Sequence, residues 1–213
     1  MNTAQKLASV KIIPVLVINS LEDGMKIGEL LVKHQLAAAE ITFRTAIAAT
    51  LIKELSRNFP SLCVGAGTIL NATDLKRAFD AGAQFAVAPG FNPKVVQAAM
   101  AENLPFAPGV CTPSEIEQAV DLGCSLLKFF PAEAAGGIKM LKSLIAPYRH
   151  LGIRFMPTGG INPNNAVDYL SINEVVAVGG TWIGSETDIK LGNWSLIEDK
   201  IIEAAQLAGT IRK

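Results

Sequence analysis

A lysine interrupts an apolar run of the chain. Lys128 lies in the segment 125–130, which is otherwise apolar, has the pattern of a buried strand and is closed by Pro131. Apolar surroundings favour a neutral amine over an ammonium ion, and a neutral amine can attack a carbonyl carbon to give a Schiff base. Taken alone, the lysine is better explained by a stem that crosses the core and carries the ammonium group to water.

A second charged residue, Glu40, changes that preference. It lies in the strand-like run 37–43, and strand alternation puts it on the face with small and polar side chains. The same alternation lets Lys128 point inward, so the two groups can meet in one interior. A merely structural ion pair gains little there, because desolvation offsets most of the attraction. We therefore predict a catalytic pair, with Lys128 forming an imine and Glu40 transferring protons.

Further candidates lie at or just beyond the ends of the predicted strands. Arg44 can hold a carboxylate through a two-pronged hydrogen bond. Thr68 offers a hydroxyl group, although a tight turn that needs its neighbouring glycines explains that segment equally well. Pro89 shapes the same rim. Phe130 has inward parity and is expected to form a wall of the pocket.

Two glycine pairs follow the last two predicted strands and suggest a phosphate site. The residues concerned are Thr158, Gly159, Gly160, Gly179, Gly180 and Thr181. Glycine lets backbone N–H groups approach an anion closely, and barrels often bind phosphate between the loops after strands seven and eight. The alternative is that these glycines serve only sharp turns.

The elements that must position these residues alternate along the chain. Strands are predicted at 12–18, 37–43, 62–66, 85–88, 105–108, 125–130, 154–157 and 175–178. Helices are predicted at 21–35, 46–58, 72–81, 93–102, 113–122, 137–147, 163–170 and 194–208, after a short amphipathic opening at 3–9. Four helices have a predicted N-cap: Asn71, Asn92, Thr112 and Asn162.

Eight strands, each followed by a helix, predict an α/β fold with a parallel sheet closed into a (β/α)8 TIM barrel. The alternative is an open doubly wound sheet, which would carry a glycine-rich turn after its first strand. Residues 18–21 contain no glycine, so we favour the barrel. The prediction is one domain over residues 1–213 with a short N-terminal helix.

Composition limits the partners. The 213 residues include 19 basic and 19 acidic ones, so no excess charge points to nucleic acid or to a membrane surface. The early apolar stretch 12–18 is too short to span a membrane, and we expect a cytoplasmic protein with a small-molecule partner. Cys63, Cys111 and Cys124 form no disulfide or zinc pattern and are expected mostly in the core. No cluster of ligands predicts a metal.

Five motifs, AEITFRT, VGAGTIL, LLKFFPAE, MPTGGI and VGGTW, appear in this order and resemble the KDPG/KHG aldolase family, where KDPG is 2-keto-3-deoxy-6-phosphogluconate and KHG is 4-hydroxy-2-oxoglutarate. The resemblance implies a class I aldolase, a homotrimer without metal or organic cofactor, that releases pyruvate from a keto acid or keto-acid phosphate. It matches Lys128 to the imine lysine and Glu40 to the acid and base. Thr181 stands where the family has serine.

Within that resemblance, Arg44, Thr68 and Phe130 match groups around the pyruvate portion of the substrate, and the glycine loops match its phosphate site. Two other functions stay open. A phosphate-binding barrel isomerase or synthase would use the same loops without an imine. A noncatalytic sugar-phosphate binder would leave the burial of Lys128 and Glu40 without a purpose.

Overall fold

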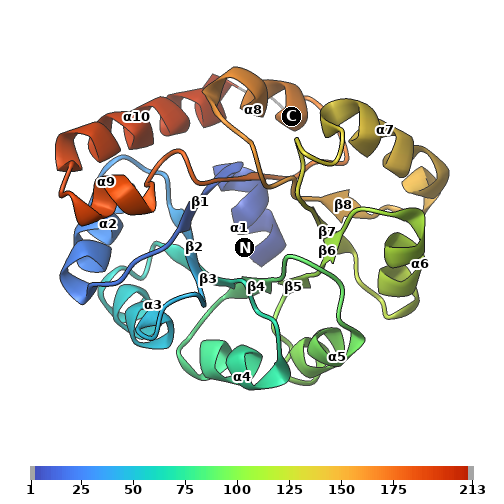
Figure 1. Cartoon of the computed structure of the whole chain (residues 1–213), viewed down its shortest axis with the longest axis horizontal. Coiled ribbons are helices and arrows are strands. Elements are labelled where there is room, and N and C mark those ends of the chain that lie inside the picture. Colours follow the sequence, from blue (N-terminus) through green and yellow to red (C-terminus); the bar gives the residue numbers. More distant parts are fainter. Residues whose placement is uncertain (1–2, 211–213) are drawn as a thin grey trace.

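Parallel strands alternate with helices through residues 3–210, the part of the chain that this computed structural model describes (Figure 1). The ends of the predicted domain, residues 1–2 and 211–213, lie outside this range. The strands are β1 (Ile12–Leu16), β2 (Ala38–Thr42), β3 (Cys63–Gly67), β4 (Phe85–Val87), β5 (Phe106–Ala107), β6 (Gly109–Val110), β7 (Leu126–Phe129), β8 (Arg154–Phe155) and β9 (Val178–Gly180). The helices are α1 (Thr3–Val10), α2 (Leu21–Lys33), α3 (Ala48–Asn58), α4 (Ala72–Asp80), α5 (Pro93–Ala101), α6 (Pro113–Asp121), α7 (Gly137–Tyr148), α8 (Pro163–Leu170), α9 (Glu186–Lys190) and α10 (Trp194–Thr210), with a 3-10 turn at Arg149–Leu151.

The predicted closed barrel of eight strands is wrong. The strands form a six-stranded sheet of order β5-β4-β3-β2-β1-β9 and a separate three-stranded sheet of order β6-β7-β8. Pro108 stands where the predicted strand 105–108 was to end, and β5 and β6 on its two sides join different sheets. Because proline has no N–H group to donate, it interrupts a hydrogen-bonded ladder.

The other junction between the two sheets is also not a continuous ladder. Isolated bridges join Phe155 to Val175 and Thr158 to Gly179, and the Val176 and Gly179 N–H groups donate across it to Phe155 O and Pro157 O. The predicted strand 175–178 overlaps β9 by a single residue, since β9 begins at Val178. The α/β class and the parallel direction of the paired strands agree with expectation.

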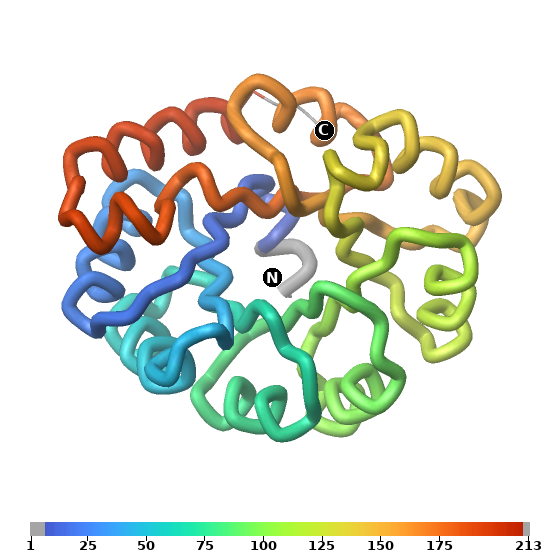
Figure 2. Tube along the Cα trace, in the orientation of Figure 1, coloured from blue at the N-terminus to red at the C-terminus, as the bar shows by residue number. Residues whose placement is uncertain are grey.

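Apolar packing surrounds the sheets on two sides. Figure 1 shows the helices as a ring outside the strands, with α1 inside that ring. A small inner cluster joins Leu7 of α1 to Ile13, Phe85 and Met156 from the sheet side. The tube in Figure 2 shows α10 running back beside α8 and α2, so the last helix covers elements from both halves of the chain.

Side-chain caps start several helices at the expected residues. Asn71, Asn92, Thr112 and Asn162 each accept a backbone hydrogen bond from the first turn of their helix, which confirms all four predicted caps. These helices follow strand ends, so each cap also fixes where a strand-to-helix loop stops. Of the cysteines, Cys63 is buried and the other two are half-buried, and no disulfide joins any of the three.

Candidate active site

Lys128 and Glu40 meet in the interior of the fold. The Lys128 Nζ atom donates a hydrogen bond to Glu40 Oε1 at 3.1 Å, and the two residues are 5% and 1% exposed. Lys128 lies on β7 and Glu40 on β2, so the pair joins the three-stranded sheet to the six-stranded one. The strand parity deduced from the sequence therefore brings both groups to one place.

The second carboxylate oxygen of Glu40 is available to accept a hydrogen bond. Among the described residues, Glu40 Oε2 is buried and has no hydrogen-bond partner. Gly67 on β3 leaves the space for this carboxylate, because an added Cβ there would lie 2.2 Å from Oε1. An unpartnered buried carboxylate oxygen is costly, so it is a natural acceptor for a substrate hydroxyl group.

An aromatic ring stands beside the amine. The Phe130 ring centroid lies 5.7 Å from Lys128 Nζ, and this half-buried ring follows β7 directly. The position fits the expected wall of the pocket. Such a wall can shield an imine from water and attract the cationic amine through its ring face.

The three other rim residues follow the carboxyl ends of β2, β3 and β4. Arg44 is exposed, Thr68 is half-buried with φ of +59°, and Pro89 is half-buried. Parallel neighbours in one sheet end at the same edge, so all three lie at one edge of the six-stranded sheet, which also carries Glu40 on β2. Their contacts with a substrate stay predictions.

The two predicted phosphate loops lie against each other. Gly179 N donates to Pro157 O at 2.9 Å, and an added Cβ at Gly179 would lie 2.5 Å from Thr158 Oγ1. That hydroxyl is buried and has no partner among the described residues. Gly159 has φ of +101° and Gly160 of +79°, which favour glycine at both positions.

The second loop is packed differently from the first. An added Cβ at Gly180 would overlap the Trp182 ring, so this glycine makes room for an indole within its own loop. Thr181 between them is exposed and available to an anion. The glycines thus permit close packing in both loops. This packing is equally compatible with the alternative that the glycines serve only sharp turns.

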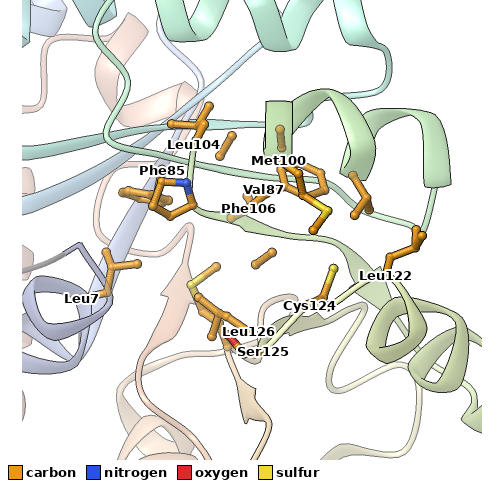
Figure 3. Close-up of a pocket in the computed structure, with 17 residues that line it drawn as sticks. Leu7, Phe85, Val87, Met100, Leu104, Phe106, Leu122, Cys124, Ser125 and Leu126 are labelled. Atoms are coloured by element: carbon orange, nitrogen blue, oxygen red, sulfur yellow. The ribbon is translucent and has the colours of Figure 1, made fainter. Parts of the chain in front are cut away.

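An apolar cavity of about 210 Å³ lies elsewhere (Figure 3). Its lining includes Leu7 of α1, Phe85 at the start of β4 and Leu126 at the start of β7, beside Met100 and Cys124. These residues mark the amino ends of the strands, opposite the rim with Arg44, Thr68 and Pro89. Lys128 and Glu40 do not line this cavity.

Metal-ligand clusters and membrane-spanning helices are both absent from residues 3–210. The described part contains no grouping of three or more His, Cys, Asp or Glu side chains that could hold a metal ion. None of the helices described there is long and apolar enough to cross a membrane.

Two polar residues beside the glycine loops were missed from the sequence. Glu133 follows Pro131 in the loop after β7, and its carboxylate is hydrogen-bonded to the hydroxyl group of Tyr169 on α8. An acidic residue just past a catalytic strand was the signal for Glu133. Tyr169 gave none, because an aromatic residue on a helix is usually core.

Comparisons with known proteins cover nearly the whole chain. A family model for aldolases, described as KDPG and KHG aldolase, matches residues 3–200. The chain is 45% identical over 193 residues to 2-dehydro-3-deoxy-phosphogluconate aldolase of Haemophilus influenzae, covering 91% of this chain and 90% of the relative. It is 37% identical over 195 residues to KHG/KDPG aldolase of Escherichia coli, with coverage of 92% and 91%.

A solved structure gives the same likeness in three dimensions. The crystal structure of KDPG aldolase from Legionella pneumophila, with pyruvate captured as a covalent carbinolamine intermediate, matches with a TM-score of 0.89. The two chains are 37% identical, and the match covers 95% of this chain and 97% of that one.

Proposed function

This chain belongs to the KDPG and KHG aldolase family, and we propose that it is a class I aldolase that cleaves 2-keto-3-deoxy-6-phosphogluconate to pyruvate and glyceraldehyde 3-phosphate. The observation that carries the proposal is the buried amine of Lys128 against Glu40. The carbinolamine in the Legionella structure is the kind of adduct that an amine forms with pyruvate. We extend the proposal to 4-hydroxy-2-oxoglutarate, cleaved to pyruvate and glyoxylate, because the Escherichia coli relative is a KHG/KDPG aldolase.

The hydrogen bond between Lys128 and Glu40 suggests how the imine forms. Transfer of one ammonium proton to Glu40 leaves a neutral amine, which attacks the C2 ketone and gives a carbinolamine. The protonated Glu40 then gives this proton to the departing hydroxyl group. Water leaves, a protonated imine remains, and Glu40 is again a carboxylate.

The carbon–carbon bond breaks from that state. Glu40 takes the proton of the C4 hydroxyl group, the C3–C4 electron pair moves toward the iminium nitrogen, and the aldehyde leaves. The resulting enamine takes the proton back at C3. Hydrolysis of the imine then releases pyruvate and frees Lys128. The imine itself accepts the electron pair, so the chemistry asks for no metal or organic cofactor.

The rim residues complete the proposed substrate site. We assign the carboxylate of the pyruvate portion to Arg44 and Thr68, with Phe130 as the wall and Pro89 at the rim. The phosphate group is assigned to the loops 158–160 and 179–181, whose glycines allow backbone N–H groups to approach an anion. The unpartnered hydroxyl of Thr158 supports a polar contact at this place.

The proposal also includes a homotrimer in the cytoplasm. Its support is the family resemblance, together with the balanced charge of the chain. Sedimentation equilibrium measures the assembly directly, and a monomer across micromolar concentrations would contradict a trimer.

Reduction with borohydride in the presence of pyruvate tests the proposed chemistry. We expect a stable adduct, located on Lys128 by mass mapping of peptides, and none in Lys128→Met. A folded wild-type protein that gives no adduct would overturn the class I mechanism. That outcome would favour the alternative function, a phosphate-binding isomerase or synthase, which needs no imine.

Glu40→Gln separates the two catalytic roles. Turnover should fall by about 100-fold or more, because the amide cannot exchange the proton of the C4 hydroxyl group. Some pyruvate should still be trapped on Lys128, since the amine is retained. An unchanged turnover number would remove Glu40 from the mechanism.

A further inference from the structure

Exposed Glu133 and buried Tyr169 form a contact that the proposed mechanism does not use. The Tyr169 hydroxyl group donates to Glu133 Oε1, and Tyr169 is fully buried on α8. Burial, together with the hydrogen bond to Glu133, raises the pKa of Tyr169. The hydroxyl group therefore keeps its proton and donates it to the carboxylate across the physiological pH range.

The backbone and the stem of Glu133 contact the first glycine loop, residues 158–160. Glu133 N donates to Gly159 O at 3.0 Å, and Ala132 N donates to Thr158 O at 2.8 Å. An added Cβ at Gly160 would lie 2.6 Å from Glu133 Cβ. The residue thus binds the loop through its backbone, packs against it with its stem and is held on α8 by its carboxylate.

These contacts orient the N–H groups of the loop. In a trans peptide the C=O and the following N–H point in opposite directions. Because the carbonyls of Thr158 and Gly159 face the segment 132–133, the N–H groups of Gly159 and Gly160 point away from it. Neither N–H group donates a hydrogen bond to another residue of the described chain.

The next carbonyl is fixed as well. Gly160 O accepts from the side-chain amides of Asn162 and Asn165 at 3.2 and 3.1 Å, at the N-terminus of α8. The loop carbonyls are therefore all turned toward protein donors, and the amides are left together beside a helix N-terminus. Successive free N–H groups in this setting suit an anion.

We propose that Glu133 and Tyr169 are positioning residues, which hold loop 158–160 with its free N–H groups turned toward the phosphate of the substrate. The inference rests on the proposed function and assigns a role to residues outside the reacting atoms. Without the Tyr169 hydroxyl, the Glu133 carboxylate loses its partner on α8, and the stem that packs against Gly160 is held less firmly. Affinity for phosphorylated substrates should fall selectively.

Tyr169→Phe tests the inference by comparing two substrates. KM for 2-keto-3-deoxy-6-phosphogluconate should rise about fivefold, while KM for 4-hydroxy-2-oxoglutarate and both kcat values stay within about twofold. Tyr148→Phe is the matched control, because Tyr148 donates to Glu117 at 2.9 Å in an exposed position between α7 and α6. The control should leave both KM values unchanged.

A double variant tests whether the two residues act through each other. Tyr169→Phe should add little to Glu133→Ala, because the hydroxyl then has no carboxylate to hold. Additive losses would contradict the coupling. Equal increases in the two KM values, or no increase, would overturn the positioning role.

A readout without turnover keeps this inference separate from the proposed chemistry. Inorganic phosphate binding, measured by calorimetry on folded protein, should weaken in Tyr169→Phe and stay unchanged in Tyr148→Phe. Pyruvate trapping on Lys128 should be equal in both. Absence of trapping in the wild type would contradict the aldolase proposal alone. Equal phosphate binding in both variants would contradict the positioning role of Glu133 and Tyr169.

Discussion

The carboxylate of Glu40 is held in place by the absence of a side chain at Gly67. An added Cβ would lie 2.2 Å from Oε1 and 2.8 Å from Cδ, so Gly67→Ala must move the carboxylate. Displacing an acid and base by about 1 Å can cost on the order of 100-fold in rate. We expect kcat to fall by that order, as measured with a coupled assay for pyruvate.

Gly209→Ala provides the control for that substitution, because an added Cβ there meets nothing within 4 Å. Its kcat should equal that of the wild type. Circular dichroism separates a displaced carboxylate from an unfolded protein. Wild-type turnover in folded Gly67→Ala would show that Glu40 does not need its present position.

Part of the site was readable from residue types and spacing. Strand parity was enough to bring Lys128 and Glu40 together, because alternation fixes the face on which each side chain lies. The contact between Glu133 and Tyr169 could not be read in this way. It joins a loop to a helix 36 positions along the chain, and no local periodicity encodes such a contact.

At the scale of elements, a reciprocal cap fixes the start of α6. Thr112 Oγ1 accepts from Glu115 N, while Glu115 Oε2 accepts from Thr112 N at 2.8 Å. Thr112→Ala should lower the free energy of unfolding by about 1 kcal/mol. Urea denaturation measures this loss, and Ser114→Ala, in the exposed first turn of the same helix, serves as the control. Equal stability of the two variants would contradict a role for the cap.

The prediction of helices and strands from the sequence was wrong where the sequence pattern was short. Caps such as Asn71 could be predicted because a single side chain accepts a hydrogen bond from a free N–H group of the first helical turn. This signal depends only on neighbouring residues. Helix α9 has only five residues and was not predicted, since one turn shows no periodicity. The split at Pro108 was missed because the apolar run around it has the composition of a continuous strand.

At the scale of the whole molecule, the catalytic pair spans the two sheets. Glu40 belongs to the six-stranded sheet and Lys128 to the three-stranded one, and no continuous ladder of paired strands joins these two described sheets. The relative position of the sheets therefore determines the distance between acid and amine. Helix α10 packs against α2 and α8 and so links the first and last parts of the chain around the sheets.

Two carboxylates attach α10 to its neighbours. Lys33 of α2, followed by His34, lowers the pKa of Glu198 to about 2. Lys200 of α10, with Ser185 and Asn193, lowers the pKa of Asp188 in α9 to about 2. Both folded-state pKa values lie below the ordinary values of 4.5 and 3.8, so the stabilisation is fully present above about pH 4.5 and is lost as the pH falls toward 2.

Glu198→Gln should therefore lower Tm at pH 7, and this difference from the wild type should shrink as the pH falls from 4.5 to 2. The reason is that the wild-type carboxylate becomes protonated in the same range and loses its contacts with Lys33 and His34. Asp199→Asn, an exposed change at the next position of α10, controls for the loss of one charge. A Tm difference that persisted unchanged at pH 2 would mean that Glu198 stabilises α10 through packing and not through its charge.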